Sequence, residues 1–420
     1  MAHLPTLKPS GKASLDKLLK ETVEKREVPA VFYGATNAKD ELYFNQAGDK
    51  VFGDSASGQV DENTYTEIFS QSKLITCIAA LQLVDKQLVS LDNPEDVEKY
   101  LPEISKLQVL KGYDENDDAI LVPPKTKVTM RHLMSHSAGF TYMLGPNILS
   151  KWAAKNPKPG LFDPKATVDL LCTPLIYEPG TSYTYGTGIE WLGKLVERVS
   201  GTDLEEYLKK NIFEPCGITT MTFYPTAEVK KNKMAVCVRD AEGKVRPIPG
   251  GFGLNRPTEV DQVPKAFLAG GAGLYGTQRN YLTFLRHVLR CDPKSPHHAS
   301  SPLISAESWE ELFKPSIPRG EGYDGVERIL DQVEKPDYIH PKPTEDSVNY
   351  SVGFLLTLED FTKGRKAGSG CWSGMAKTQF WIDPKTGLAA ICGTQLISPP
   401  PDAWYPAYVE YERALYAALE

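Results

Sequence analysis

Residues 70–87 read SQSKLITCIAALQLVDKQ, and this stretch decides the fold expected for the chain. Between Leu74 and Val84 only Thr76 and Gln82 are polar. A helix that is apolar nearly all round is buried on most of its sides. The stretch therefore predicts a helix that runs through the middle of the molecule.

The first turn of this predicted helix carries two residues with complementary chemistry, Ser70 and Lys73. Residues at i and i+3 share one face of a helix, with β-carbons about 5–6 Å apart. A backbone N–H at a helix N-terminus has no partner within the helix, and the helix dipole favours a negative charge there. Burial of the Lys73 amine favours its neutral form, which can accept a proton. The turn therefore predicts a serine acyl-transfer centre with its nucleophile and its base.

The S-x-x-K pattern alone is weak evidence, because it occurs twice in the chain. The other copy, Ser14 to Lys17, opens a run of helical period over residues 14–26, where Ser14 is a candidate cap and Lys17 faces solvent. The Ser70 copy differs because a lysine is rarely buried without a partner. Only the Ser70 copy is therefore taken as a candidate site.

Strand patterns lie near both ends of the chain, and helical patterns lie between them. The terminal patterns predict two strands, then three strands and a closing helix: residues 28–36, 41–47, 351–358, 371–382, 387–395 and 403–419. The middle predicts helices at residues 129–135, 189–200, 203–212, 277–290 and 305–314. This order indicates an α+β fold.

The expected architecture is an α/β sandwich, in which an antiparallel sheet from both termini is flanked by helices and a mainly helical domain is inserted. Residues 1–92 and 345–420 would form the discontinuous α/β domain, and residues 93–344 the inserted domain. Binding pockets often lie between domains, so the active site is expected at the seam.

Composition excludes several classes of protein. The 420 residues include 47 Lys and Arg against 54 Asp and Glu, a net charge of −7, which does not favour a nucleic-acid partner. No apolar run reaches the ~18 residues that a membrane span needs. The 7 cysteines show no C-x-x-C spacing and no hydrophobic signal core opens the chain, which indicates free thiols and a cytoplasmic location.

Three further motifs follow the S-x-x-K pattern in order along the chain: MRHLMSHSAG at residues 130–139, YTYGTGIEWLG at 183–193 and AGGAGLY at 269–275. With them, the chain resembles the serine β-lactamase and penicillin-binding-protein superfamily over nearly its whole length. It is most similar to the class C-like branch, which includes family VIII carboxylesterases and the fungal acyltransferases of the lovastatin-biosynthesis type. The resemblance implies a β-lactamase/transpeptidase-like fold and an acyl-enzyme mechanism that needs no metal and no cofactor.

The resemblance also implies roles for individual residues. Ser70 matches the acylated nucleophile and Lys73 the lysine of the first motif. Tyr185 matches the tyrosine of the second motif, whose phenol shares a proton with the lysine and the serine. These three residues are the expected catalytic set.

The third motif of the superfamily is a strand, matched here by Trp372, Ser373 and Gly374. The resemblance implies that this strand binds the substrate, and a glycine lets another group approach the strand backbone closely. The residue after that glycine supplies the second oxyanion-hole N–H, so Ser70 and Met375 are the expected pair of donors.

Two departures from the superfamily pattern bear on the substrate. Thr187 stands where β-lactamases have Asn in the second motif, and Trp372 stands where they have a cation in the third. β-Lactamases present a positive charge to the substrate carboxylate, whereas Trp372 offers an apolar wall. Both departures favour neutral esters or thioesters, with Thr187 and Trp372 as substrate-binding residues.

Other signals are better explained without catalysis. Residues 385–387 are a true Lys-Thr-Gly string, but they follow Asp-Pro and predict a hairpin turn. His132 and His136 have the i, i+4 spacing of a metal pair, yet no third ligand is evident, so structural histidines are favoured. Ser137 lies in SHSAG, which only nearly matches a nucleophile elbow. The glycines of residues 270–273 indicate a tight turn beside the active site.

The expected function is that of a serine esterase or acyltransferase, in which an ester or thioester acylates Ser70 and water or an alcohol receives the acyl group. Its partners are a small-molecule acyl donor and, for transfer, an alcohol acceptor. Two alternatives stay open: hydrolysis of β-lactams or D-alanyl peptides, and a non-catalytic descendant that binds ligands or serves as a scaffold. Parts of residues 140–180 and 245–265 are expected to cover the pocket and set its specificity.

Overall fold

The computed structural model describes residues 4–143, 145, 147–248, 267–320, 323–333, 343–398 and 402–420. These residues form one antiparallel sheet of seven strands: β1 (Val31–Asn37), β2 (Glu41–Ala47), β11 (Val348–Tyr350), β12 (Leu355–Thr357), β13 (Ser369–Gly374), β14 (Thr378–Asp383) and β15 (Leu388–Gly393). The strand order is β11-β12-β13-β14-β15-β1-β2, so β1 from the N-terminal end pairs with β15 from the C-terminal end. The prediction of a single sheet built from both termini is confirmed.

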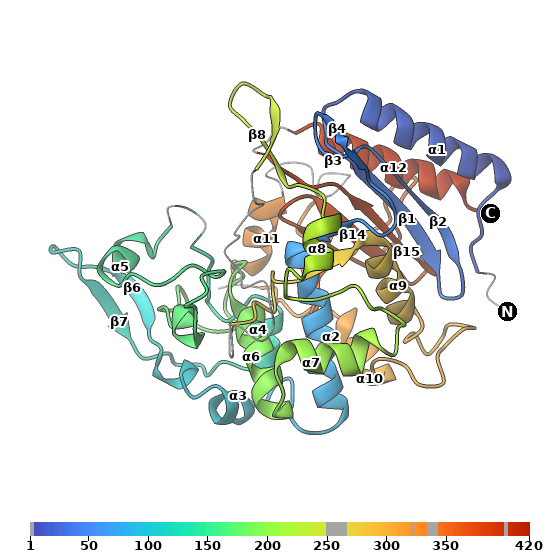
Figure 1. The fold of residues 1–420 in the computed structure, drawn as a ribbon. Helices are drawn as coiled ribbons and strands as arrows, with labels where there is room; N and C mark the ends of the chain where they lie inside the picture. The colour runs from blue at the N-terminus through green and yellow to red at the C-terminus, as the bar shows by residue number, and fades with distance from the viewer. Residues whose placement is uncertain are drawn as a thin grey trace.

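Two helices from opposite ends of the chain lie side by side on one face of the sheet, α1 (Pro9–Glu24) and α12 (Trp404–Ala418) (Figure 1). They pack closely, since a β-carbon added to Gly11 would lie 2.5 Å from Ala418 Cβ. The helix predicted from Ser14 begins earlier, and Ser14 donates a hydrogen bond to the carbonyl of Ser10 from inside it, so the predicted cap is wrong. Proline suits the first turn of a helix, where its missing N–H is not needed. The exposed residues of this first turn add nothing to the apolar periodicity, so the pattern did not indicate the start at Pro9.

The other face of the sheet packs against α9 (Gln278–Leu289), and α2 (Ser72–Asp85) runs through the centre of the molecule (Figure 1). Every residue of α2 from Ser72 to Leu83 is buried. This confirms the prediction of a central helix, although the first turn of the predicted helix is a separate 3-10 turn, Phe69–Gln71.

Two strands predicted near the C-terminus are each divided in the structure. The run predicted as one strand over 371–382 is the pair β13 and β14, joined by a turn in which Lys377 has a positive φ of 66°. The run predicted over 351–358 is a turn followed by β12, because Ser351 Oγ accepts the backbone N–H groups of Gly353 and Phe354. The sequence hid both turns, because residues 375–377 (Met-Ala-Lys) include no typical turn residue and the bend at Ser351 is made by side-chain hydrogen bonds.

The middle of the chain contains the predicted helices, α4 (Met130–Met134), α6 (Gly188–Ser200), α7 (Leu204–Leu208) and α10 (Ala306–Leu312), with α7 continuing as a π-helical turn, Lys209–Phe213. It also contains elements that the patterns did not predict: α3 (Pro94–Tyr100), α5 (Ser150–Lys155), α8 (Ala227–Asn232), α11 (Gly325–Val333), the hairpin β6 (Val109–Tyr113) and β7 (Ala119–Val122), and the strands β8 (Cys237–Arg239), β9 (Val245–Pro247) and β10 (Tyr275–Thr277). The β6–β7 hairpin and α5 lie together at the far side of the molecule from the sheet (Figure 1).

Short strands complete the fold. They are β3 (Asp49–Val51), β4 (Asp54–Gln59), β5 (Tyr65–Glu67) and β16 (Leu396–Ile397). β5 pairs with β10, and β16 pairs with β8, so both ends of the chain pair with its middle. One hydrophobic cluster likewise includes Ile78, Leu195 and Phe380. The domain boundaries at residues 92 and 345 stay a prediction, but the core that they would divide is continuous.

Candidate active site

Ser70 lies in the 3-10 turn Phe69–Gln71 that leads into α2. The residue before it, Phe69, is buried and has a positive φ of 44°. A bulky residue in this region of φ is strained and is held there only by its surroundings. The positive φ of Phe69 keeps the helical turn from extending back beyond Ser70, so the serine lies at the N-terminal end of the central helix.

Ser70, Lys73 and Tyr185 come together as the sequence predicts. Ser70 Oγ lies 3.2 Å from Lys73 Nζ and 2.6 Å from Tyr185 Oη, both within hydrogen-bond range. Lys73 is 1% exposed, as expected for a lysine on a buried helix. Trp372 Nε1 donates to Tyr185 Oη at 3.3 Å, which ties the tyrosine to β13. A hydroxyl, an amine and a phenol therefore share one hydrogen-bonded cluster.

Two further groups contact the Lys73 amine, the Tyr142 phenol and the Gly271 carbonyl, and the sequence did not predict Tyr142. Lys73 Nζ donates to Tyr142 Oη at 3.0 Å and to the carbonyl oxygen of Gly271 at 2.8 Å. Gly271 belongs to the glycine-rich turn that was predicted to lie beside the site. Tyr142 precedes α5 and has no spacing relation to the motifs, so no pattern in the sequence pointed to it.

The Tyr142 phenol in turn contacts a buried carboxylate. Tyr142 Oη donates to both carboxylate oxygens of Glu190, at 2.8 Å and 2.9 Å, and Glu190 is 0% exposed. Glu190 lies in the first turn of α6, in the sequence GIEWLG, where it interrupts an apolar run. An acidic residue at such a position is rarely buried without a function or a partner, and this signal could have identified it.

Burial governs the ionisation of these groups. Burial raises the pKa of the Glu190 carboxyl, while the nearby Lys73 and the hydrogen bond from Tyr142 oppose that change. Burial, and next the charge of Glu190, raises the pKa of the Tyr142 phenol well above its usual range. Tyr142 therefore keeps its proton and acts as a hydrogen-bond donor to the carboxylate.

The predicted substrate-binding residues line one cavity together with Ser70 and Tyr185. The cavity has a volume of about 740 Å³, and its wall includes Thr187, Trp372, Ser373, Gly374 and Met375. The Trp372 ring packs against those of Tyr185 and Tyr350, with centroids 5.1 Å and 5.3 Å apart. The arrangement brings every predicted site residue into one place, and their individual roles stay predictions.

Gly374 was predicted to let substrate approach the strand backbone closely, and the structure shows a second reason for a glycine at this position. A β-carbon there would lie 2.5 Å from the carbonyl oxygen of Ile68 and 2.3 Å from Thr378 Oγ1. The glycine therefore allows β13 to pack against the backbone just before Ser70. This close packing places Met375, the next residue, at the wall of the cavity near Ser70.

The rest of the cavity wall is mostly apolar. Residues from the predicted covering segment 140–180 supply it: Met143, Trp152, Pro157, Pro159, Leu161, Phe162 and Leu170. Among the described residues of the wall, Lys158 alone carries a charge, and its amine pairs with Asp169 at 2.7 Å. Most of the other predicted covering segment, 245–265, lies outside the described residues.

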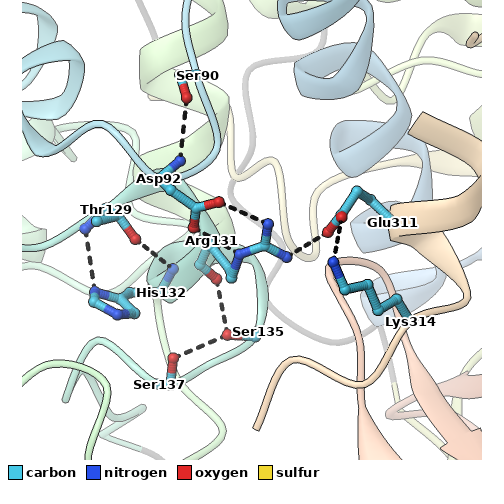
Figure 2. Close-up of polar contacts among 9 residues, drawn as sticks. All are labelled: Ser90, Asp92, Thr129, Arg131, His132, Ser135, Ser137, Glu311 and Lys314. Carbon is cyan, nitrogen blue, oxygen red and sulfur yellow. Dashed lines mark hydrogen bonds and ion pairs between the residues drawn. The ribbon is translucent and has the colours of Figure 1, made fainter. Parts of the chain in front are cut away.

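Figure 2 shows why His132 and Ser137 have structural roles. His132 Nδ1 accepts the backbone N–H of Thr129, and Thr129 Oγ1 accepts that of His132, a capping box at the start of α4. Ser137 shares a hydrogen bond with Ser135, and Ser135 bonds the carbonyl of Arg131, whose guanidinium joins Asp92 to Glu311 (Figure 2). The described residues contain no group of three or more His, Cys, Asp and Glu side chains that could hold a metal ion.

His136 is buried, its Nδ1 accepts the backbone N–H of Gly186, and its ring lies 4.7 Å from that of Tyr185. Its Nε2 is buried and has no hydrogen-bond partner among the described residues, so a structural role for His136 stays a prediction. The predicted turn at residues 385–387 is confirmed. The Lys-Thr-Gly string of residues 385–387 is a turn, in which Thr386 bonds Asp383 and Gly387 has a φ of 73°. No helix in the described ranges is long and apolar enough to cross a membrane.

The free energy of unfolding is expected to fall as the pH is lowered from about 6.5 to about 4. Burial lowers the pKa of His132 to about 4, so the unfolded chain binds a proton at a higher pH than the folded chain does. The contribution of neutral His132 to the free energy of unfolding is complete above pH 6.5, the pKa in the unfolded chain. It is lost as the pH falls to the pKa of about 4 in the folded chain. Thermal unfolding of the wild type and of His132→Gln near pH 7 and pH 5 checks this prediction. The unfolding midpoint of the variant should fall less between pH 7 and pH 5 than that of the wild type, and equal falls would contradict the prediction.

Comparisons with known proteins agree with this geometry. Residues 15–408 match the model of the Beta-lactamase family. The chain is 29% identical over 392 residues to the lovastatin esterase of Penicillium rubens, covering 92% of this chain and 93% of that protein. It is 27% identical over 413 residues to the monacolin J acid methylbutanoyltransferase of Aspergillus terreus, covering 97% and 96%. The unliganded simvastatin synthase of Aspergillus terreus superposes with a TM-score of 0.82 at 26% identity, over 97% of this chain and 98% of that chain. The fold is β-lactamase/transpeptidase-like, and the chain belongs to the Beta-lactamase family.

Proposed function

We propose that this protein is a serine esterase or acyltransferase that forms an acyl-enzyme on Ser70. One observation carries the proposal: Ser70 Oγ opens into an apolar cavity while it lies within hydrogen-bond reach of both Lys73 Nζ and Tyr185 Oη. A nucleophile beside a base that is itself held by further contacts is the arrangement that covalent acyl transfer needs. Relatives named as an esterase and as an acyltransferase support both halves of the proposal.

In the first half-reaction, the Ser70 oxygen attacks the carbonyl carbon of an ester or thioester. The Ser70 O–H bond breaks, its proton passes to the lone pair of Lys73 Nζ, and the carbonyl electron pair moves to oxygen. The tetrahedral intermediate then collapses, the bond to the leaving group breaks, and the proton leaves with the alcohol or thiol. Tyr185 Oη, 2.6 Å from Ser70 Oγ, is placed to relay that proton.

The second half-reaction repeats these steps with a different nucleophile. Water attacks the acyl-enzyme to give an acid, and an alcohol attacks it to give a new ester. In both, the backbone N–H groups of Ser70 and Met375 are proposed to hold the negative oxygen of the intermediate. Met375 follows Gly374 at the cavity wall, where close packing against Ile68 brings it toward Ser70.

The cavity favours neutral substrates with a bulky apolar part. Its described wall carries one charged side chain, Lys158, which is already paired with Asp169. Trp372 occupies the strand position at which the superfamily pattern has a cation. We therefore propose small-molecule esters or thioesters as acyl donors, with water or an alcohol as acceptor. Of the alternatives, β-lactam hydrolysis is disfavoured by the lack of a free cation among the described wall residues.

Turnover of p-nitrophenyl esters is the direct test of this function. We expect a burst of p-nitrophenol followed by a steady rate, because p-nitrophenol leaves readily, so acylation is fast and the slower deacylation limits turnover. Adding a cyclic or branched alcohol should divert the acyl group into a new ester, seen by mass spectrometry. The chromogenic cephalosporin nitrocefin serves as the control substrate and should turn over poorly. Rapid nitrocefin turnover with slow ester turnover would contradict the proposal, as would the absence of a Ser70 adduct with a fluorophosphonate probe.

A further inference from the structure

We infer that Glu190 is a positioning residue whose buried carboxylate provides the counter-charge of Lys73, acting through the Tyr142 phenol. The inference rests on the proposed function and deepens it, since it adds two residues to the proton path of the nucleophile. The resulting chain runs from Ser70 through Lys73 and Tyr142 to Glu190.

The hydrogen-bond distances connect these four residues without a gap. Ser70 Oγ lies 3.2 Å from Lys73 Nζ, which lies 3.0 Å from Tyr142 Oη. Tyr142 Oη contacts the two Glu190 oxygens at 2.8 Å and 2.9 Å, so the phenol can donate to either of them. A phenol can accept one hydrogen bond and donate another, and here it accepts from the amine and donates to the carboxylate.

The number of donors and acceptors around Lys73 fits both states of the reaction. Lys73 Nζ donates to Ser70 Oγ, Tyr142 Oη and Gly271 O, which uses all three N–H bonds of a protonated amine. In the neutral amine that accepts the serine proton, the lone pair takes the place of the N–H toward Ser70 Oγ. When the serine proton moves to nitrogen, the amine gains a third N–H toward the same serine oxygen. The cation thus forms without any change in its partners, and the other two bonds simply become stronger.

A positive charge formed in this buried place needs a negative charge nearby. Lys73 is 1% exposed and Glu190 is 0% exposed, so neither is stabilised by bulk water. The backbone of Gly271 packs closely against this carboxylate, because a β-carbon on Gly271 would lie 2.4 Å from Glu190 Oε1. Tyr142 is the link, since its oxygen is in direct contact with both charged groups.

The arrangement also predicts how activity depends on pH. The ionisable side chains that face this carboxylate and its phenol partner are Lys73 from α2, Tyr142 and Tyr185 from loops, and Tyr350 from β11. Burial raises the pKa of Glu190, so the carboxylate takes up a proton at a higher pH than an exposed one. Protonated Glu190 no longer balances the charge of Lys73. We therefore expect kcat/KM to fall on the acid side as Glu190 is protonated.

The experiment compares Glu190→Gln, Tyr142→Phe and the double variant in the hydrolysis of a p-nitrophenyl ester. Gln keeps the shape and one acceptor oxygen but removes the charge, and Phe removes the link but leaves the carboxylate. Each single change should lower kcat about 10²–10⁴-fold, with KM changed much less. Because both act through one chain, the double variant should be no slower than Tyr142→Phe alone. Glu190→Gln should also shift the acid-side fall in kcat/KM, because the carboxylate that faces the Lys73 amine is gone.

A matched control separates this role from a general need for buried acids. Glu205 is also buried, on α7, where it accepts hydrogen bonds from Thr222 and the backbone of Phe223. Glu205→Gln should keep the wild-type kcat and pH profile. The inference is overturned if Glu190→Gln does the same, or if the effects of the two site substitutions multiply in the double variant. If the wild type forms no Ser70 adduct with a fluorophosphonate, the proposed function fails first and this inference falls with it.

Discussion

Ser70→Ala is expected to lower kcat for ester hydrolysis by about 10⁴-fold or more, because the oxygen that carries the acyl group is removed. Lys73 and Tyr185, which contact Ser70 Oγ in the wild type, then have no proton to transfer. Any residual rate would come from substrate binding and from the oxyanion-hole donors alone. Steady-state turnover of a p-nitrophenyl ester measures the effect. Adding Lys73→Ala to Ser70→Ala should cost little more, since residues of one catalytic unit are strongly non-additive.

Ser137→Ala is the matched control for this prediction. Ser137 lies in a sequence that nearly matches a nucleophile elbow, but it is 2% exposed and bonds the hydroxyl of Ser135 (Figure 2). Its replacement should leave kcat near the wild-type value. Undiminished turnover in Ser70→Ala would reject Ser70 as the nucleophile, and loss of turnover in Ser137→Ala alone would point to the other serine.

Arg365→Leu is expected to destabilise the fold by about 3–5 kcal/mol, the largest stability effect expected of any single substitution considered for this chain. Arg365 is 1% exposed and lies between β12 and β13. Its Nε and Nη2 donate to the Glu412 carboxylate of α12 at 2.9 Å and 2.5 Å, and Nη2 also contacts Tyr408 Oη. Leucine would leave the Glu412 charge buried with no cation, and that unpaired charge is the source of the cost. The midpoint of thermal unfolding, followed by circular dichroism, reports it.

Two variants make this prediction specific to a buried charge. Arg279 pairs with Glu41 at 2.9 Å, with their side chains 45% and 24% exposed. Arg279→Leu should therefore cost less than about 1 kcal/mol. Adding Glu412→Leu to Arg365→Leu should recover part of the lost stability, because no unpaired charge then remains. Equal losses for Arg365→Leu and Arg279→Leu would contradict the explanation.

Local patterns predicted the parts of the fold that depend on near neighbours in sequence. The central helix followed from a nearly continuous apolar run, and β1 and β2 followed from two strand patterns near the N-terminus. The limits of β13 and β14 did not follow, because the turn between them runs through Met-Ala-Lys at residues 375–377, which includes no typical turn residue, and places Lys377 at a positive φ. Ser14 was likewise predicted to cap a helix, because it precedes the apolar periodic residues. The helix in fact starts earlier, at Pro9.

The site residues that lie in motifs could be predicted from the sequence, whereas Tyr142 and Glu190, which lie in no recognised motif position, could not. Tyr185 carries a motif, so it could be assigned from the sequence although it lies 115 residues from Ser70. Glu190 left only the faint signal of an acid within an apolar run, and Tyr142 left none. Tyr142 contacts the Lys73 amine and Glu190 contacts Tyr142, because α6 and the loop before α5 pack beside α2.

The sequence by itself determined that Ser70 and Lys73 share one face of a buried segment, because three residues of helix bring two side chains together through local geometry alone. Only the tertiary structure decided which groups surround that pair. Four distant segments supply these groups: Tyr142, Glu190, Gly271 and Trp372. They meet around the Lys73 amine and the Tyr185 phenol, because strands from the two ends of the chain pair in one sheet and the middle of the chain packs against α2. The ionisation of a buried carboxylate depends on such contacts and on exclusion of water, and neither is a property of a local stretch of chain.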